Sequence, residues 1–142
     1  HYGYLGHSYL CQWVNLGAGT STSNLKNNYS KIDMTINGEK VNTDSIFLGS
    51  IIGDHTKTGI MTMLNTGTLA GISSNLFGTG YHRKLIKSFS WDDSTTGENT
   101  DYDIAKAIGT ARTSMKRRGI EMTKAYEDML RQIFEKKSDL AV

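Results

Sequence analysis

Histidine is the residue type in this 142-residue chain best suited to proton transfer near neutral pH, because its unperturbed pKa is about 6.5. The chain has four histidines, His1, His7, His55 and His82. Three histidines can also bind zinc when they lie close together and each has a second hydrogen-bond partner. His7 and His55 share a position in a six-residue repeat, but nothing else supports a zinc site. We therefore predict no metal ligands in this chain.

The single cysteine, Cys11, cannot form a disulfide within the chain. This cysteine content is typical of a reducing compartment, so we predict a cytoplasmic location. We interpret Cys11 as a small packed side chain rather than a nucleophile. The sequence contains no nucleophile-elbow motif and no phosphate-binding loop motif.

Residues 81–84 (YHRK) form a short basic patch. Our preferred interpretation is a solvated end of a folded unit. The alternative is a contact with a phosphorylated cofactor, which a cluster of positive charge would attract.

A repeat of six residues from 46 to 80 predicts the scaffold that positions these side chains. An α-helix repeats its apolar residues near 3.6 and a strand near 2, whereas a six-residue period is typical of a parallel β-helix. We expect aliphatic first positions and small fifth positions to point inward, and glycine at second positions to form the corners. The first positions are Ile46, Ile52, Thr58, Leu64, Ala70 and Leu76, and the fifth are Ser50, Thr56, Thr62, Thr68, Ser74 and Gly80.

A β-hairpin interrupts this repeat. Residues 1–27 follow the same period with one slip near Leu5. Residues 31–36 then alternate with period two, and Asn37-Gly38, a strong hairpin signal, precedes a return strand at 39–43. We predict an insertion at about 30–44 that stands out from the coils.

The C-terminal part predicts two helices after a linker. We divide the chain into a β-helix at 1–86, a linker at 87–100 in which Phe89 and Trp91 dock on the coil, and a helical extension at 101–142. Gly119 is expected to end the first helix and Thr123 to cap the second. The predicted apolar faces are Ile104, Ala107, Ile108, Ala111 and Met115 in the first helix, and Tyr126, Met129, Leu130, Ile133 and Phe134 in the second. These faces would cover a coil face or contact another subunit.

Composition excludes several classes of partner. The formal charge of +2 is too balanced to predict nucleic-acid binding. The sequence contains no run of 18 apolar residues, so it predicts no membrane-spanning segment. There is no signal-peptide pattern at the start. The chain begins at His1 in the middle of a repeat, and an open coil end needs a cap or a neighbour. We therefore expect a C-terminal piece of a longer protein.

Three stretches resemble a known family. Residues 1–6 read HYGYLG, residues 15–20 read NLGAGT, and Asn24 follows three residues later. They match, without a gap, the pattern H-L-S-Y-I-G, eight variable residues, N-I-G-A-G-T, three residues and Asn of GlmU-type bifunctional enzymes. Residues 51–54 (IIGD) resemble a later motif of that family, and the similarity covers about residues 1–80. These enzymes join a sugar-1-phosphate nucleotidyltransferase to an acetyltransferase.

The resemblance implies a fold, an activity and roles for individual residues. The implied fold is a left-handed parallel β-helix of about four coils, ~4.8 Å apart, assembled as a homotrimer. The implied reaction transfers an acetyl group from acetyl-CoA to an amino-sugar-1-phosphate, and Mg²⁺ would serve only the absent nucleotidyltransferase half. His1 matches the general base, and Tyr4 and Asn24 match residues that hold the sugar phosphate. The corner formed by Gly17, Ala18 and Gly19 lies where the family's acyl-CoA passes.

The sequence departs from the family pattern after Asn24. Many members have N-Y-D-G where this chain has Asn24-Leu-Lys-Asn27, and the hairpin replaces a short loop. Lys26 and Lys31 are possible replacements for a phosphate-binding lysine. The alternative function is a non-catalytic oligomerisation or regulatory module of a nucleotidyltransferase, such as a glucose-1-phosphate thymidylyl- or uridylyltransferase.

Overall fold

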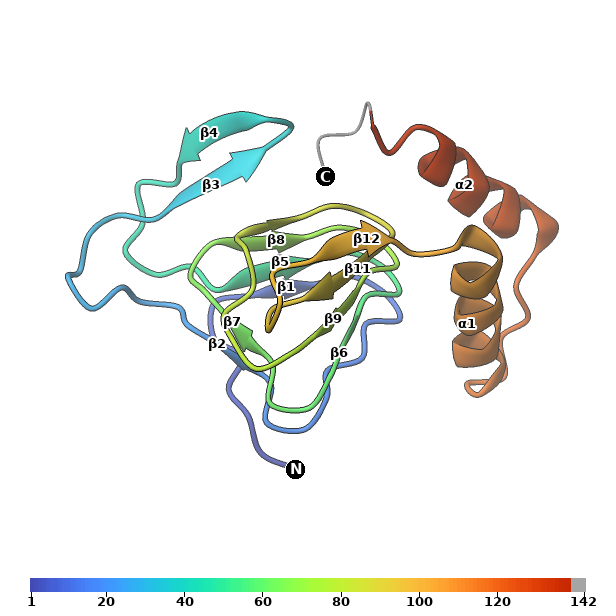
Figure 1. Ribbon diagram of the computed structural model, residues 1–142, viewed down its shortest axis with the longest axis horizontal. Coiled ribbons are helices and arrows are strands. Elements are labelled where there is room, and N and C mark those ends of the chain that lie inside the picture. Colours follow the sequence, from blue (N-terminus) through green and yellow to red (C-terminus); the bar gives the residue numbers. More distant parts are fainter. Residues whose placement is uncertain (139–142) are drawn as a thin grey trace.

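A computed structural model describes residues 1–138 and shows stacks of short strands with two helices beside them (Figure 1). The first stack contains, in order, β1 (Tyr9–Leu10), β5 (Ser50–Ile52), β8 (Thr68–Ala70) and β10 (Leu85–Ile86). The second contains β6 (Lys57–Thr58), β9 (Asn75–Phe77) and β11 (Ser90–Asp93), with β12 (Asn99–Asp101) antiparallel at its edge. The third pairs β2 (Ser21–Thr22) with β7 (Met63–Leu64).

The pairing register shows that the chain returns to the same stack after three six-residue units. Ile51 pairs with Leu69, and Lys57 pairs with Asn75, each partner being 18 positions later in the sequence. All pairs between successive coils are parallel. The structure is therefore mainly β and compatible with the predicted parallel β-helix, and the left-handed sense of the coil stays a prediction.

The repeat places its side chains inside as predicted. The core cluster contains four first-position residues of the repeat, together with Ile86 from β10. These five are Ile52, Leu64, Ala70, Leu76 and Ile86. The fifth-position hydroxyl residues are also buried, from Ser50 to Ser74. Ile46 is the exception among the aliphatic first positions, because it lies on the return from the hairpin, before the chain re-enters the first stack.

The corners, however, do not form at the second-position glycines. The backbone is left-handed at fourth positions instead, with φ of 61° at His55, 60° at Met61 and 53° at Ser73. The glycines are needed because neighbouring coils approach closely. A Cβ on Gly71 would lie 2.4 Å from the Ser88 nitrogen, and one on Gly53 would lie 2.8 Å from the Gly71 carbonyl carbon.

This close approach predicts the effect of adding one methyl group. We expect Gly71→Ala to lower the free energy of unfolding by about 1–3 kcal/mol, because the backbone of the next coil must move. Gly59→Ala is the matched control, since its Cβ would meet nothing closer than 3.5 Å. It should change stability by less than about 0.5 kcal/mol in the same urea titration. Equal effects of the two substitutions would contradict this account.

The hairpin forms where it was predicted and rests on the coil. β3 (Asp33–Ile36) pairs antiparallel with β4 (Glu39–Asn42). The turn residues Asn37 and Gly38 have φ of 49° and 77°, as a type I′ turn requires. Contrary to expectation, the hairpin is not free of the coil: Ile32 and Met34 are buried, and β3 contacts β8.

The segment 87–100 is not a simple linker. Its residues form β11, which pairs in parallel with β9, so the coil continues through the region predicted to connect it to the helices. The predicted aromatic contacts are present: Phe89 is fully buried, and the Trp91 ring lies 5.5 Å from the Phe77 ring. The division of the chain into domains stays a prediction.

Two capped helices follow the coil. In α1 (Ile104–Lys116), the Asp103 carboxylate accepts a hydrogen bond from the Lys106 amide, and in α2 (Lys124–Glu135), Thr123 accepts from the Tyr126 amide. Gly119, with φ of 74°, lies in the turn between them. The predicted apolar face of α1 is buried except at Ile104, whereas in α2 only Leu130 is fully buried. Neither helix in the described part of the chain has the length and apolar character that crossing a membrane requires.

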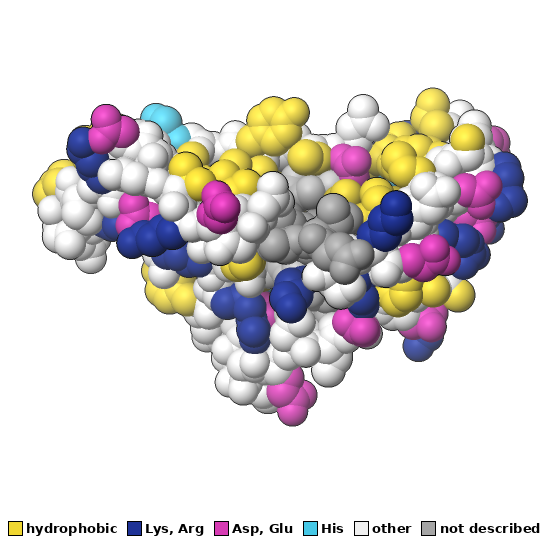
Figure 2. Space-filling model, turned by 90° about the horizontal axis from the view of Figure 1, so that it is seen from above, with side chains coloured by type: hydrophobic (Ala, Val, Ile, Leu, Met, Phe, Trp, Pro, Cys, Tyr) yellow, Lys and Arg dark blue, Asp and Glu magenta, His cyan; other side chains and the backbone are white. Residues whose placement is uncertain are grey.

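The helix α2 docks on one corner of the coil. The Tyr126 hydroxyl lies 3.0 Å from His55 Nε2, and the Phe134 ring packs edge-on against Phe89 at 5.2 Å. Both partners are corner residues with positive φ. Viewed from above, the molecule shows basic, acidic and hydrophobic side chains interspersed at both ends (Figure 2).

The docking contact predicts a pH dependence. Burial, reinforced by the positive charge of Lys57, lowers the pKa of His55 from 6.5 to about 4. The folded state therefore binds this proton less readily than the unfolded state, so stability is complete above pH 6.5 and falls between pH 6.5 and 4. At pH 5 the loss from this group should be about 2 kcal/mol.

The test compares unfolding by urea at pH 7 and pH 5 in the wild type and in His55→Gln. Glutamine keeps a hydrogen-bonding group beside Tyr126 but does not titrate in this range. The variant should therefore lose less stability on acidification than the wild type. The same loss in both proteins would exclude His55 as the source.

Candidate functional site

Two of the predicted site residues converge on one glycine. A Cβ built on Gly6 would lie 2.4 Å from the Tyr4 hydroxyl oxygen and 2.8 Å from Asn24 Nδ2, so both side chains occupy the space that a side chain at position 6 would need. The coil holds them there: Tyr4 pairs with Ser21 across the third stack, and the Asn24 carbonyl accepts a hydrogen bond from the Leu48 amide. Tyr4 and Asn24, which the resemblance matches to sugar-phosphate binding, thus lie beside the same glycine in the structure.

A third side chain, His7, belongs to the same cluster. Its Nδ1 lies 2.7 Å from Asn24 Nδ2, and its ring stacks on Phe47 at 5.1 Å. The asparagine amide fixes the orientation of the imidazole, and which ring nitrogen carries the proton depends on the orientation of that amide. His7 is exposed and so is accessible to a ligand. His7 was interpreted from the sequence only as a zinc ligand with no further support, although its place directly after Gly6 was a usable signal.

His1, the predicted base, is exposed at the start of the chain. The adjacent backbone is anchored, because the Tyr2 carbonyl accepts a 2.6 Å hydrogen bond from the Gly19 amide. Within residues 1–138, the His1 imidazole has no hydrogen bond to Tyr4, Asn24 or any other residue. Its role as base stays a prediction.

The two candidate lysines hold the base of the hairpin. Lys26 Nζ donates to the Lys31 carbonyl at 2.6 Å and lies 3.3 Å from the Ser30 hydroxyl, while the Lys31 ammonium pairs with Asp44. Lys26 also lines a hollow of about 470 Å³ beside Tyr81. Lys26 therefore remains available to an anion in this hollow, whereas a phosphate at Lys31 must compete with Asp44.

The glycines of the predicted acyl-CoA corner have a structural explanation. A Cβ on Gly17 would lie 2.3 Å from the Gly59 carbonyl oxygen, and Gly19 has φ of 77° with Met61 Sδ 2.4 Å from its ideal Cβ. Ala18, between them, contributes its carbonyl to the Met61 amide at 2.7 Å. Coil packing alone requires glycine at 17 and 19, so these residues are not evidence for a cofactor.

The basic patch at 81–84 is solvated only in part, since Tyr81, Arg83 and Lys84 are exposed whereas His82 is not. His82 is buried, and its Nδ1 lies 2.6 Å from the Asp92 carboxylate, which also accepts from Arg83 and Asn99. Burial would raise the pKa of Asp92, but the hydrogen bonds from His82 and Asn99 and the charge of Arg83 together lower it. His82 and Arg83 therefore bind a buried carboxylate of the following strand, while Lys84 remains exposed.

Metal chemistry finds no support in the described part of the chain. Residues 1–138 contain no group of three histidine, cysteine, aspartate or glutamate side chains placed to hold a metal ion.

Curated proteins with similar sequences point to the same family as the motifs. The chain is 30% identical over 77 residues to the bifunctional sugar-1-phosphate nucleotidylyltransferase/acetyltransferase of Sulfurisphaera tokodaii. The matched segment is 54% of this chain and 19% of the relative. It is 36% and 35% identical, over 74 residues each, to the bifunctional GlmU proteins of Methanococcus vannielii and Methanococcus aeolicus, covering 52% of this chain and 18% of each relative.

The resemblance to GlmU-like bifunctional enzymes is confirmed. No family model matches the chain. The matched segment spans about a fifth of the length of these curated relatives, so the activities in their names concern much longer proteins.

Proposed function

We propose that this chain carries the acyl-transfer site of a sugar-1-phosphate nucleotidyltransferase/acetyltransferase, and that it acetylates the amine of an amino-sugar-1-phosphate from acetyl-CoA. The relatives' names support this association. The single observation that carries it is the convergence of Tyr4 and Asn24 on Gly6, because these are the matched sugar-binding positions. The left hand of the coil and a cytoplasmic location are part of the same proposal.

The mechanism requires three things: a neutral amine, a base near neutral pH, and stabilisation of the developing oxyanion. In our proposal the nitrogen of the sugar amine attacks the thioester carbonyl while His1 takes the proton from that nitrogen. The thiolate of coenzyme A then leaves. Tyr4 and Asn24 hold the sugar phosphate by hydrogen bonds. No covalent enzyme intermediate forms. Burial raises the pKa of the Cys11 thiol, and the Asp54 carboxylate raises it further, so Cys11 is a poor nucleophile.

The base can be tested in the full-length gene product with acetyl-CoA and glucosamine-1-phosphate or galactosamine-1-phosphate. His1→Ala should lower turnover by ~100-fold or more, as for a positioned general base. Cys11→Ser is the matched control and should retain wild-type turnover. Full turnover in His1→Ala, in a protein that acetylates either sugar, would exclude His1 as the base.

His7 then becomes the alternative base, and the same assay distinguishes the two histidines. The Asn24 contact orients the His7 ring, whereas no hydrogen bond within residues 1–138 orients the His1 ring. If His7→Ala abolishes turnover while His1→Ala does not, the acyl-transfer proposal survives with His7 as its base.

A homotrimer is the assembly that this function calls for, since the resemblance places the family's sites at subunit contacts. Apolar side chains exposed along one edge of the coil support self-association. Tyr2 is 71% and Ile60 73% exposed, and the Tyr2 hydroxyl contacts Met61 Sδ at 3.0 Å. We expect light scattering to give three times the chain mass at micromolar concentration. Ile60→Lys should lower this measured mass, because it places a charge on the apolar edge. A stable monomer in the wild type would contradict the proposal.

The second candidate function is a non-catalytic oligomerisation or regulatory module. Two observations favour it: Leu25 stands where many family members have tyrosine, and Asp44 engages the Lys31 ammonium. Crystals soaked with acetyl-CoA and a hexosamine phosphate distinguish the two functions. Ordered ligand between Asn24 and Gly17 excludes the module, whereas a full-length protein that makes nucleotide sugars but never transfers acetyl groups supports it.

A further inference from the structure

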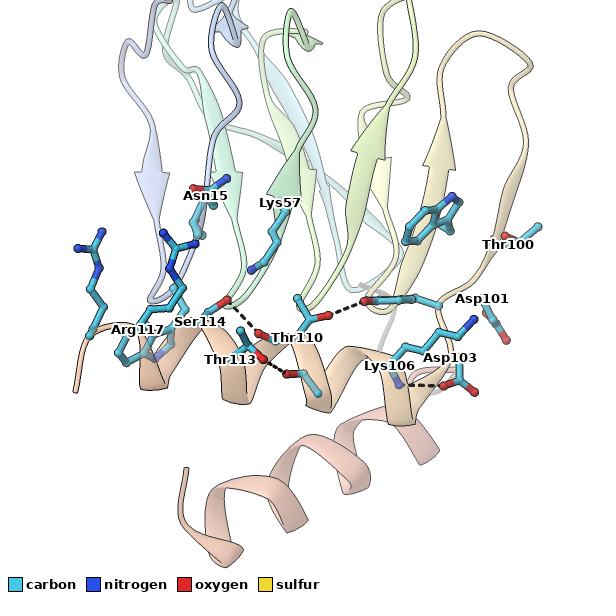
Figure 3. A pocket seen from close by; sticks show the side chains of 16 residues that line it. Asn15, Lys57, Thr100, Asp101, Asp103, Lys106, Thr110, Thr113, Ser114 and Arg117 are labelled. Carbon is cyan, nitrogen blue, oxygen red and sulfur yellow. Dashed lines mark hydrogen bonds between the residues drawn. The ribbon is translucent and has the colours of Figure 1, made fainter. Parts of the chain in front are cut away.

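A groove of about 1330 Å³ separates α1 from the second strand stack (Figure 3). One wall comes from the coil, with Asn15, Lys57 and Trp91. The other wall is the polar side of α1, with Thr110, Thr113 and Ser114, and Arg117 lies beyond its C-terminal end (Figure 3). The groove lies on a different stack from Tyr4, so it is separate from the His7–Asn24 cluster within one chain.

The groove carries an excess of unpaired positive charge. Its two carboxylates have other roles: Asp101 pairs with Lys137 at 2.7 Å, and Asp103 caps α1. Its four cations are Lys57, Lys106, Arg117 and Arg118. Within residues 1–138 none of these four forms an ion pair with a carboxylate. A hollow lined by uncompensated cations attracts anions, because its low-dielectric walls concentrate the field.

Lys57 is the most informative of these cations. It is half-buried, it points from the strand stack toward α1 (Figure 3), and its Nζ donates one hydrogen bond, of 3.1 Å, to the His55 carbonyl. Two of its three protons remain available. Burial lowers the pKa of Lys57, which is the cost of holding an ammonium group here without a carboxylate. A bound anion would remove that cost.

The rest of the lining suits a ligand that has donors as well as phosphate oxygens. Thr113 and Ser114 donate their protons to carbonyls of α1, at 2.9 and 3.0 Å, so their oxygens retain free lone pairs. The ligand's hydroxyl or amine groups can donate to these oxygens. Arg117 supplies a planar guanidinium that matches phosphate.

Two tryptophans, Trp13 and Trp91, add flat apolar surface to the groove. Trp91 is 44% exposed and is held by the Phe77 and Tyr102 rings at 5.5 and 5.3 Å. Lys57 and Trp91 both pair with Asn75, on opposite sides, so they lie two strand spacings apart, about 10 Å. A separation of this order suits a ligand with phosphates at one end and an aromatic base at the other.

We propose that the groove between the second strand stack and α1 is a nucleotide-binding site, in which Lys57 and Arg117 bind phosphates and Trp91 stacks on the base. This inference does not rest on the proposed acyl transfer. The nucleotide has two possible sources: the nucleotide part of coenzyme A, or a free nucleotide or nucleotide sugar that acts on the protein.

Tryptophan fluorescence offers a direct test, because the chain has two tryptophans and both line the groove. The probes are ADP, coenzyme A, UDP-glucose and inorganic pyrophosphate, with calorimetry in parallel. We expect saturable binding of at least one nucleotide, weakened about 10-fold or more by Lys57→Ala and by Arg117→Ala, since each removes a charge-assisted hydrogen bond. Lys124→Ala is the matched control, because Lys124 pairs with Asp128 on α2 and lies outside the groove. It should leave binding unchanged.

The order of affinities identifies the source. Tighter binding of coenzyme A than of UDP-glucose assigns the site to the co-substrate, and the reverse order assigns it to a nucleotide sugar. No saturable binding of any nucleotide up to millimolar concentration overturns the proposal, as do pyrophosphate binding as tightly as the nucleotides and unchanged binding in both groove variants. Arg117 is exposed beyond the end of α1, so Arg117→Ala keeps the test valid if Lys57→Ala fails to fold.

Discussion

The close approach of successive coils is the constraint on which the rest of the structure depends. Coils this close bury the carbonyl groups at their corners, and these carbonyls must then accept hydrogen bonds from donors inside the protein. Two of the fifth-position hydroxyls do this across the gap: Thr56 donates to the Gly71 carbonyl at 2.5 Å, and Ser74 donates to the Lys87 carbonyl at 2.8 Å. Thr62 and Thr68 instead donate to carbonyls of their own coil, three residues earlier. This explains why positions 56 and 74 hold Thr and Ser rather than an aliphatic residue of similar size. Glycine at 53 and 71 follows from the same spacing, and so does the narrow aliphatic core.

The same constraint decides where a site can form. A regular coil covers its corners with the next coil, but the hairpin insertion delays that coil after Asn24. The returning chain brings Phe47 against His7 and the Leu48 amide to the Asn24 carbonyl. The insertion therefore frames the Tyr4, His7 and Asn24 cluster instead of covering it. A difference in this insertion between relatives would change the wall of the site without changing the coil that supports it.

Sequence reasoning predicted the features that repeat and missed those that break the repeat. The six-residue period was enough to place Ile52, Leu64 and Leu76 in the core, and the Asn37-Gly38 turn was enough for the hairpin. β11 was missed because its coil is two residues shorter, with Asn75 pairing to Trp91, 16 positions later. It also buries Asp92, which binds the equally buried His82. A buried contact between a carboxylate and a histidine has no signal in an apolar repeat, so a strand looked like a polar linker and its histidine partner looked like part of a surface patch.

The site could be predicted only as far as its motif extended. Tyr4 and Asn24 lie together because the matched spacing corresponds to about one circuit of the coil. His7 has a left-handed φ of 45°, and His55 at the same place of the repeat also has a left-handed φ, but the period alone does not show that the His7 ring lies against Asn24. The groove beside α1 was not predicted, because it requires the orientation of a helix relative to a strand stack. Periodicity identifies the buried face of a helix, but it does not say how closely the adjoining polar side approaches its neighbour.

The contacts of Lys57 connect the groove to the docking of the helices. Its ammonium donates to the His55 carbonyl, and its charge contributes to the low pKa of His55, whose ring lies against Tyr126 of α2. An anion beside Lys57 would offset that charge and make protonation of His55 less costly. Linkage is reciprocal, so protonation of His55 would then strengthen anion binding by the same free energy. An anion in the groove and a proton on His55 therefore act on the same electrostatic interaction, the repulsion between the Lys57 ammonium and a protonated His55.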